Sequence, residues 1–264
     1  MDTVTAQDFL DVEFKQFFED DGRKYQKTKK RHRDKKVKGV NVKPAQTEKM
    51  VLRLIEPKTQ TQEKVFQSYG YGNNMVLHGT AGTGKTFLSL YLALDEVYNE
   101  KAYSSVKIIR SAVPTRDIGF LPGKQEEKTE VYEAPYSEIC SELFNRKNAY
   151  DTLKRNGSIE FITTSFLRGM TFRNSVIVVD EVQNMSFQEL DTIMTRVGEN
   201  CRVILCGDFK QSDHIKTSDK NDVKKFLEIL KRVNGVDFIQ FNIKDIVRSG
   251  FVRAWLLACE SYED

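Results

Sequence analysis

Short apolar, β-branched segments alternate with longer segments of helical periodicity through most of the chain. Six segments have the length and composition of buried strands, namely residues 75–77, 106–109, 159–163, 176–179, 202–206 and 236–241. Helical spacing of apolar residues predicts a helix from about Thr61 and further helices over 87–98, 134–144, 187–196 and 223–233. This alternation predicts an α/β fold whose mainly parallel sheet is covered by helices on both faces.

A phosphate-binding motif lies between the first predicted strand and the helix that follows it. The segment GTAGTGKT fits the pattern G-x-x-x-x-G-K-[ST] in the expected strand-to-helix context. In this pattern backbone N–H groups cradle phosphates, the lysine reaches the β- and γ-phosphates, and the last hydroxyl binds Mg²⁺. The residues are Gly79, Thr80, Ala81, Gly82, Thr83, Gly84, Lys85 and Thr86. The alternative is a flexible turn that fits the pattern by accident.

Two adjacent carboxylates follow the predicted strand 176–179. An apolar strand that ends in Asp180 and Glu181 predicts a cation at its end. Asp180 suits a hold on Mg²⁺, directly or through water, and Glu181 is placed to polarise an attacking water as general base. The alternative is that Asp180 only caps the next helix.

The next predicted strand runs into a third set of polar residues, Gly207, Asp208 and Gln211. A turn explains the first two, whereas Gln211 is a candidate sensor of the γ-phosphate. Water activation together with phosphate sensing indicates hydrolysis coupled to movement. A small-molecule kinase would need an acceptor pocket, for which we find no motif.

Composition is that of an ordinary soluble protein with one sizeable domain. Of the 264 residues 39% are hydrophobic and 30% charged, and no stretch approaches the roughly 18 apolar residues of a membrane span. The N-terminus does not resemble a secretion signal, so we expect a cytoplasmic protein without a membrane partner. The four cysteines form no CxxC pair, which favours buried thiols over disulfides or zinc.

The charge is concentrated in one segment near the N-terminus. Residues 23–38 carry ten Lys or Arg against one Asp, whereas the whole chain has a net charge of only +3. Such a segment repels itself and is expected to be disordered when free, and it suits phosphate backbones through counterion release. A solubilising tail is the alternative.

Beyond these single motifs, the sequence resembles the PhoH family of ATPases, relatives of superfamily 1 helicases. The resemblance rests on eight blocks in the order of the family, over residues 57–62, 79–86, 110–128, 165–172, 176–185, 190–198, 204–213 and 245–252. It implies a RecA-like ATPase domain over 46–264 that follows an extension over 1–45. It also implies that Gln62 reads adenine, and that ATP and Mg²⁺ are the cofactors. Two departures, Arg116 and Ser249, affect expected partner contacts rather than hydrolysis.

The resemblance also raises the question of how the ATP site is completed. A superfamily 1 helicase takes arginines from a second RecA domain, and this chain is expected to have one such domain. A neighbouring subunit is then expected to supply the cation, which implies a homo-oligomeric ring, most plausibly a hexamer. Arg248 is the leading candidate, followed by Arg196 and Arg168, although each is also explained as a salt-bridge partner.

Two classes of function remain open. One is a nucleic-acid-dependent ATPase, a helicase or translocase on single-stranded RNA or DNA without nuclease activity. The other is a nucleotide-gated assembly or binding protein with slow hydrolysis and no unwinding. Segment 112–136 suits either class. Its aromatic and basic residues, among them Phe120, can stack on bases and follow a strand, whereas Phe120 and Leu121 can equally pack against a neighbouring subunit.

Overall fold

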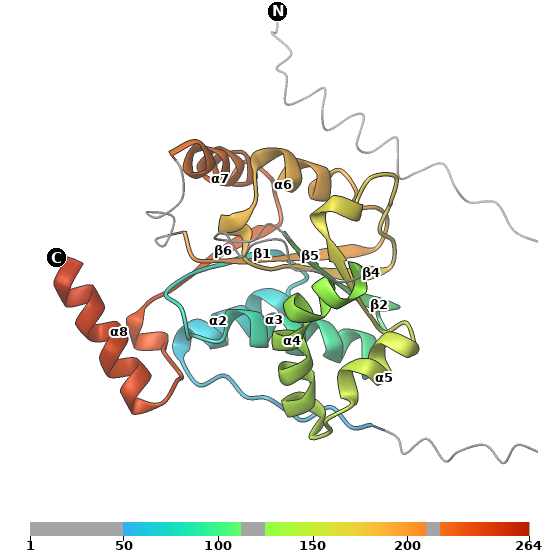
Figure 1. Ribbon diagram of the computed structural model, residues 1–264, viewed down its shortest axis with the longest axis horizontal. Helices are drawn as coiled ribbons and strands as arrows, with labels where there is room; N and C mark the ends of the chain where they lie inside the picture. The colour runs from blue at the N-terminus through green and yellow to red at the C-terminus, as the bar shows by residue number, and fades with distance from the viewer. Residues whose placement is uncertain (1–49, 112–124, 210–216, 264) are drawn as a thin grey trace, which may run out of the picture. The chain divides into compact units, whose positions relative to one another are not determined.

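The core is a six-stranded sheet in which every pair of neighbouring strands is parallel (Figure 1). The computed structural model describes residues 50–111, 125–209 and 217–263. The strands are β1 (Asn74–Gly79), β2 (Ser105–Arg110), β3 (Ile159–Thr163), β4 (Ser175–Val179), β5 (Cys201–Gly207) and β6 (Val236–Phe241), in the spatial order β3-β2-β4-β5-β1-β6. The predicted α/β fold is therefore confirmed, and every predicted strand is present within two residues of its expected ends.

Seven α-helices lie within the described residues. They are α2 (Gln60–Gly70), α3 (Lys85–Tyr98), α4 (Gln125–Phe144), α5 (Ala149–Arg155), α6 (Phe187–Met194), α7 (Thr217–Leu230) and α8 (Gly250–Glu263). The sequence pattern did not predict α5 or α8. Helix α4 begins at Gln125 rather than Ala134 and includes Pro135.

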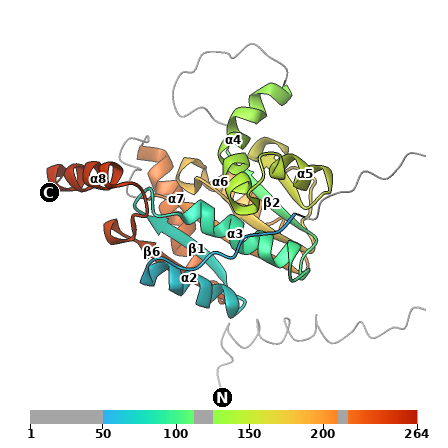
Figure 2. The same cartoon turned by 90° about the horizontal axis from the view of Figure 1, so that it is seen from below.

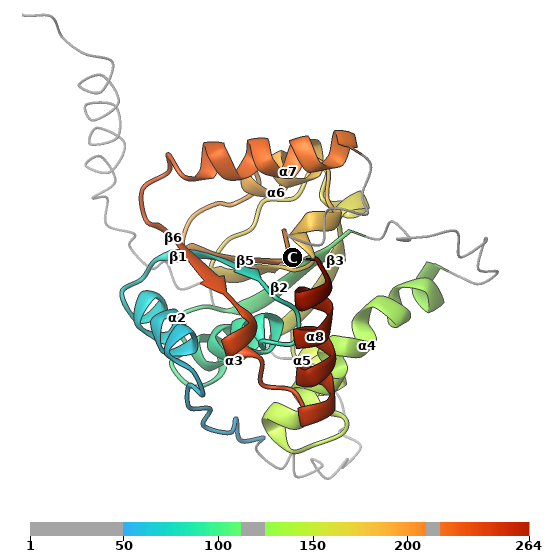
Figure 3. The same ribbon diagram turned by 90° about the vertical axis from the view of Figure 1, so that its left-hand side faces the viewer.

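The helices cover both faces of the sheet, as the alternation of strands and helices predicted. Helices α2, α3, α4 and α5 lie on one face, and α6 and α7 on the other (Figures 1 and 3). Along β4, Val176 and Val178 belong to the core of the first face, whereas Ile177 and Val179 belong to that of the second. All five residues of β4 are buried, because a central parallel strand is covered on both sides.

The parallel arrangement brings the predicted motifs together at one edge of the sheet. Strand β5 lies between β1 and β4, with His78 opposite Gly207 and Val179 opposite Leu205. The segments that leave the carboxyl ends of β1, β4 and β5 therefore begin side by side. In open parallel sheets this edge is where ligands bind.

Helix α8 lies apart from the two layers of helices (Figures 1 and 2). Several of its large apolar residues are exposed, with Phe251 81% and Trp255 62% exposed, whereas Leu256 is half-buried. Among the described residues no helix has the length and apolar character that crossing a bilayer requires. All four cysteines are free thiols, of which Cys140 and Cys206 are buried. The predicted boundary between residues 45 and 46 and the basic segment lie outside the described residues.

Gly79, where β1 enters the phosphate-binding motif, is closely surrounded. Its φ is +109°, and a Cβ there would lie 2.0 Å from the carbonyl oxygen of Phe241 on β6. Gly157 also has a positive φ, +73°, but a Cβ there meets no atom within 4 Å. The two glycines therefore separate the cost of the backbone conformation from the cost of the collision.

We expect Gly79→Ala to destabilise the protein more than Gly157→Ala does. The second substitution carries only the left-handed penalty of about 1–2 kcal/mol, whereas the first also displaces the backbone of β6. Unfolding in urea, followed by circular dichroism, measures both free energies. Equal losses would show that β6 yields to the added methyl group without cost.

Candidate nucleotide-binding site

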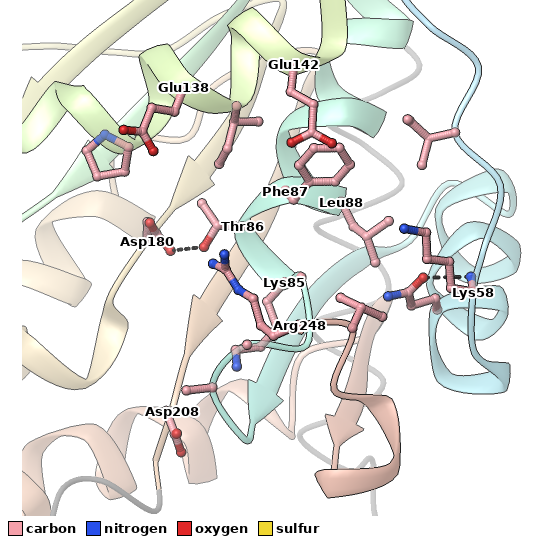
Figure 4. Close-up of a pocket in the computed structure, with 18 of the residues that line it drawn as sticks. Lys58, Lys85, Thr86, Phe87, Leu88, Glu138, Glu142, Asp180, Asp208 and Arg248 are labelled. Atoms are coloured by element: carbon pink, nitrogen blue, oxygen red, sulfur yellow. Dashed lines mark hydrogen bonds between the residues drawn. The ribbon is translucent and has the colours of Figure 1, made fainter. Parts of the chain in front are cut away.

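A pocket of about 520 Å³ lies at the carboxyl edge of the sheet (Figure 4). Its volume is within the range of small-molecule and cofactor sites. Residues from six parts of the chain line it, among them Lys58, Gln62, Ala81, Gly82, Gly84, Lys85, Thr86, Glu138, Glu142, Asp180, Glu181, Gln183, Asp208 and Arg248. The structure thus brings the phosphate-binding motif and both carboxylates predicted from the sequence into one cavity.

The phosphate-binding motif forms a loop that closes around the side chain of Lys85. The Lys85 ammonium donates hydrogen bonds to the carbonyl oxygens of Gly79 at 2.6 Å and Thr80 at 2.9 Å. Thr83 Oγ1 also donates to Thr80 O, at 2.9 Å. Burial lowers the pKa of Lys85 from its usual value, against the opposing effect of Asp208. Helix α3 begins at Lys85, so the positive end of its dipole faces the pocket.

Asp180 is held by hydroxyl groups on both of its carboxylate oxygens. Thr86 Oγ1 donates to Oδ1 and the Tyr136 hydroxyl donates to Oδ2, each at 2.9 Å. Burial, and then the neighbouring Glu181, raise the pKa of Asp180, whereas the two hydroxyls and Arg110 oppose this shift. Asp180 does not cap the next helix, because Ser186 caps α6 in a capping box with Glu189.

These oxygen atoms fit a magnesium ion. Thr86 and Asp180 present a hydroxyl and a carboxylate next to one another at the start of α3, and hard oxygen ligands are what Mg²⁺ prefers. A threonine hydroxyl that donates its proton to Asp180 keeps its lone pairs available for a metal. The residue types and their contacts therefore agree with the metal site expected from the sequence.

Glu181 is oriented by Gln183, a residue that the sequence analysis did not select. Gln183 Nε2 donates to Glu181 Oε2 at 2.6 Å, and Gln183 Oε1 accepts from the backbone N–H of Asp208 at 3.1 Å. Gln183 is buried, and Glu181 has a left-handed backbone with φ +56°. The amide of Gln183 thus connects the end of β4 to the end of β5. Its position two residues after Glu181 was the available signal.

Gln62 is buried against the phosphate-binding loop. Its Nε2 donates to Thr83 O at 3.2 Å, and its Oε1 accepts from the backbone N–H of Lys58 at 2.8 Å. Thr59 caps α2 by accepting a hydrogen bond from the backbone N–H of Gln62. Gln62 therefore connects α2 to the loop and lines the pocket, and its role toward adenine remains a prediction.

Of the three candidate arginines, Arg248 lies in the pocket of its own chain. The backbone N–H of Val247 donates to Gly82 O at 3.2 Å, and a Cβ at Gly82 would lie 3.1 Å from Arg248 Cγ. Arg248 lines the pocket with Lys85 and Thr86 (Figure 4). Arg168 is exposed and Arg196 has a buried Nε without a hydrogen-bond partner among the described residues, and neither lines the pocket.

Several predicted residues lie outside the described part of the chain. They are the γ-phosphate sensor Gln211, the pair Phe120 and Leu121 of segment 112–136, and the basic segment 23–38. The roles predicted for them are not tested. Of segment 112–136, the described part belongs to α4, which contributes Pro135 to the pocket.

The fold and the pocket define a P-loop nucleotide-binding protein. A PhoH-like protein family model matches residues 54–260, so the chain belongs to the PhoH family. A PhoH-like protein of Synechocystis is 31% identical over 80% of this chain and 64% of its own length. Protein PhoH2 of Bacillus subtilis is 37% identical over 53% of this chain and 33% of its own length. The chain therefore spans less than two thirds of either relative.

Among solved structures, the Sulfolobus solfataricus SWI2/SNF2 ATPase core in complex with dsDNA aligns with a TM-score of 0.40 and 14% identity. The alignment covers 74% of this chain and 48% of that chain.

We expect Gln183→Leu to reduce turnover while nucleotide binding is kept. The leucine leaves Glu181 and the Asp208 N–H without the partner that orients them, so kcat is expected to fall about tenfold with little change in KM. Steady-state hydrolysis over a range of ATP concentrations measures both constants. Gln67→Leu is the matched control, because Gln67 hydrogen-bonds Glu63 on the exposed surface of α2. An unchanged kcat in Gln183→Leu would remove this residue from the catalytic arrangement.

Proposed function

We propose that this protein hydrolyses ATP in a Mg²⁺-dependent reaction and couples hydrolysis to the binding or remodelling of single-stranded nucleic acid. One observation carries the first half of this proposal. Lys85, Thr86, Asp180 and Glu181 come from two different strand ends and line a single pocket of nucleotide size. Membership of the PhoH family supports the same activity.

Different residues of the site serve different steps of phosphoryl transfer. The loop from Gly79 to Gly84 and the start of α3 bind the phosphates through backbone N–H groups, and Lys85 exchanges its loop carbonyl contacts for phosphate oxygens. Thr86 and Asp180 hold Mg²⁺, which neutralises charge on the phosphates when bound. Glu181 accepts the proton of the attacking water as general base. Gln211 is proposed to sense the γ-phosphate.

The coupling to nucleic acid rests on charge. Residues 23–38 concentrate ten of the basic residues against one Asp, and such a segment binds phosphate backbones by counterion release. The resemblance to superfamily 1 helicases points the same way. We place this activity in the cytoplasm.

We also propose that the protein assembles into a homo-oligomeric ring, a hexamer. From the sequence, a neighbouring subunit was expected to supply an arginine to the ATP site. Arg248 lies against the loop of its own chain, and the chain that it serves is tested below. The exposed apolar residues of α8, such as Phe251 and Trp255, now provide the main support for assembly. They also favour the alternative function, a nucleotide-gated assembly protein with slow hydrolysis and no unwinding.

Addition of single-stranded RNA or DNA is expected to raise the rate of ATP hydrolysis roughly tenfold, equivalent to about 1.4 kcal/mol of activation free energy. Steady-state hydrolysis at low salt, with each polymer in turn, measures the effect. Lys85→Ala is the control for contaminating activity, because the variant lacks the phosphate-binding ammonium. Slow hydrolysis that neither polymer changes would favour the nucleotide-gated assembly protein.

Arg248→Ala is expected to bind ATP and to lose turnover by roughly three orders of magnitude, because the arginine stabilises the charge of the transferring phosphoryl group. Mixing this variant with Lys85→Ala tests which chain is served. If Arg248 acts within its own chain, no mixed oligomer contains a complete site and activity stays lost. Recovery of activity on mixing would show that Arg248 acts across a subunit interface, and normal turnover of the single variant would exclude it from catalysis.

A further inference from the structure

Helix α4 contributes side chains to the pocket although it contains none of the predicted nucleotide-binding motifs. Its residues Pro135, Glu138, Ile139 and Glu142 line the pocket beside the phosphate-binding loop. Tyr136 lies among them in sequence but points into the core, where its side chain is fully buried. Its ring lies 5.7 Å from that of Phe161, in a tilted arrangement. The aromatic ring of Tyr136 therefore fills its place in the core without the help of the hydroxyl group.

The hydroxyl of Tyr136 has a separate role from the ring. It donates to Asp180 Oδ2 at 2.9 Å, while Thr86 donates to Oδ1 at the same distance. A carboxylate with a fixed donor on each oxygen cannot rotate about its Cβ–Cγ bond without losing one of them. The two hydroxyls therefore define the plane of the Asp180 carboxylate and its direction relative to Thr86.

We propose that Tyr136 is a positioning residue for the metal site: its hydroxyl holds Asp180 oriented toward Thr86 and thereby sets the affinity of the pocket for Mg²⁺. The inference rests on the proposed Mg²⁺-dependent nucleotide function. Hydrogen-bond donors that do not touch the metal themselves orient metal-binding carboxylates, and their loss commonly lowers metal affinity by about 10–100-fold. Because Tyr136 belongs to α4, the helix that lines the pocket is connected to Asp180 by this hydrogen bond.

Electrostatic surroundings agree with this role. Burial is the largest influence on Asp180 and raises its pKa, and the hydrogen bond from Tyr136 is the first of the effects that oppose this. Arg110, at the end of β2, acts on both groups and lowers the pKa of each. The hydroxyl of Tyr136 thus approaches Asp180 as a donor, on the carboxylate oxygen that Thr86 does not occupy.

The test compares Tyr136→Phe with Tyr150→Phe. Tyr150 is a matched control, because it is 3% exposed and its hydroxyl donates to a carboxylate, Glu133, at 2.7 Å. It does not line the nucleotide pocket. Each substitution removes one phenol–carboxylate hydrogen bond and keeps the ring, so both variants are expected to lower the melting temperature by a few degrees.

The decisive measurement is binding of a fluorescent ADP analogue to the full chain over a range of Mg²⁺ concentrations, with EDTA as the metal-free reference. In Tyr136→Phe the Mg²⁺ concentration for half-maximal enhancement is expected to rise about tenfold, with unchanged affinity in EDTA. In Tyr150→Phe it is expected to equal that of the wild type.

Two results would overturn the inference in different ways. In the first, wild-type binding depends on Mg²⁺, and either Tyr136→Phe behaves like the wild type or Tyr150→Phe shifts as much as Tyr136→Phe does. Tyr136 would then be a packing residue, and the proposed function would stay intact. Wild-type binding that does not respond to Mg²⁺ would overturn the proposed function and this inference together.

Discussion

A buried carboxylate at the end of a central strand is the constraint on which the arrangement of this site depends. Asp180 is only 5% exposed, and an ionised group without partners in such a place is costly. The chain meets this cost with donors from two separate helices, Thr86 at the start of α3 and Tyr136 in α4. Those helices are consequently fixed relative to β4 by the same group that is proposed to bind the metal.

The parallel sheet makes this convergence possible. Because β5 separates β1 from β4, the phosphate-binding loop and Asp180 leave the sheet on either side of β5. Thr86 nevertheless donates a hydrogen bond to Asp180, and Gln183 reaches the end of β5 through the backbone N–H of Asp208. Glu181, the proposed general base just beyond the end of β4, and the segment that follows β5 are therefore connected through the side-chain amide of Gln183.

The sequence predicted those parts of the site that depend on local patterns. Alternating apolar segments located every strand, and the spacing of Gly79, Gly84 and Lys85 located the phosphate-binding loop, because both features are encoded by near neighbours in the chain. Tyr136 was not selected, because it lies 44 residues from Asp180 and nothing in its own helix marks it as polar-partnered. Contacts of that kind depend on the packing of α4 onto the sheet.

The position of Arg248 connects the nucleotide pocket to helix α8. A neighbouring subunit was expected to supply an arginine because a single RecA-like domain was expected, and this stays a prediction. Within one chain, the hydrogen bond from Val247 to Gly82 holds Arg248 beside its own loop. Helix α8 begins two residues later and presents Phe251 and Trp255 to solvent. A subunit that covered this helix would restrict the segment that carries Arg248. Assembly and hydrolysis would then be connected through the position of one arginine.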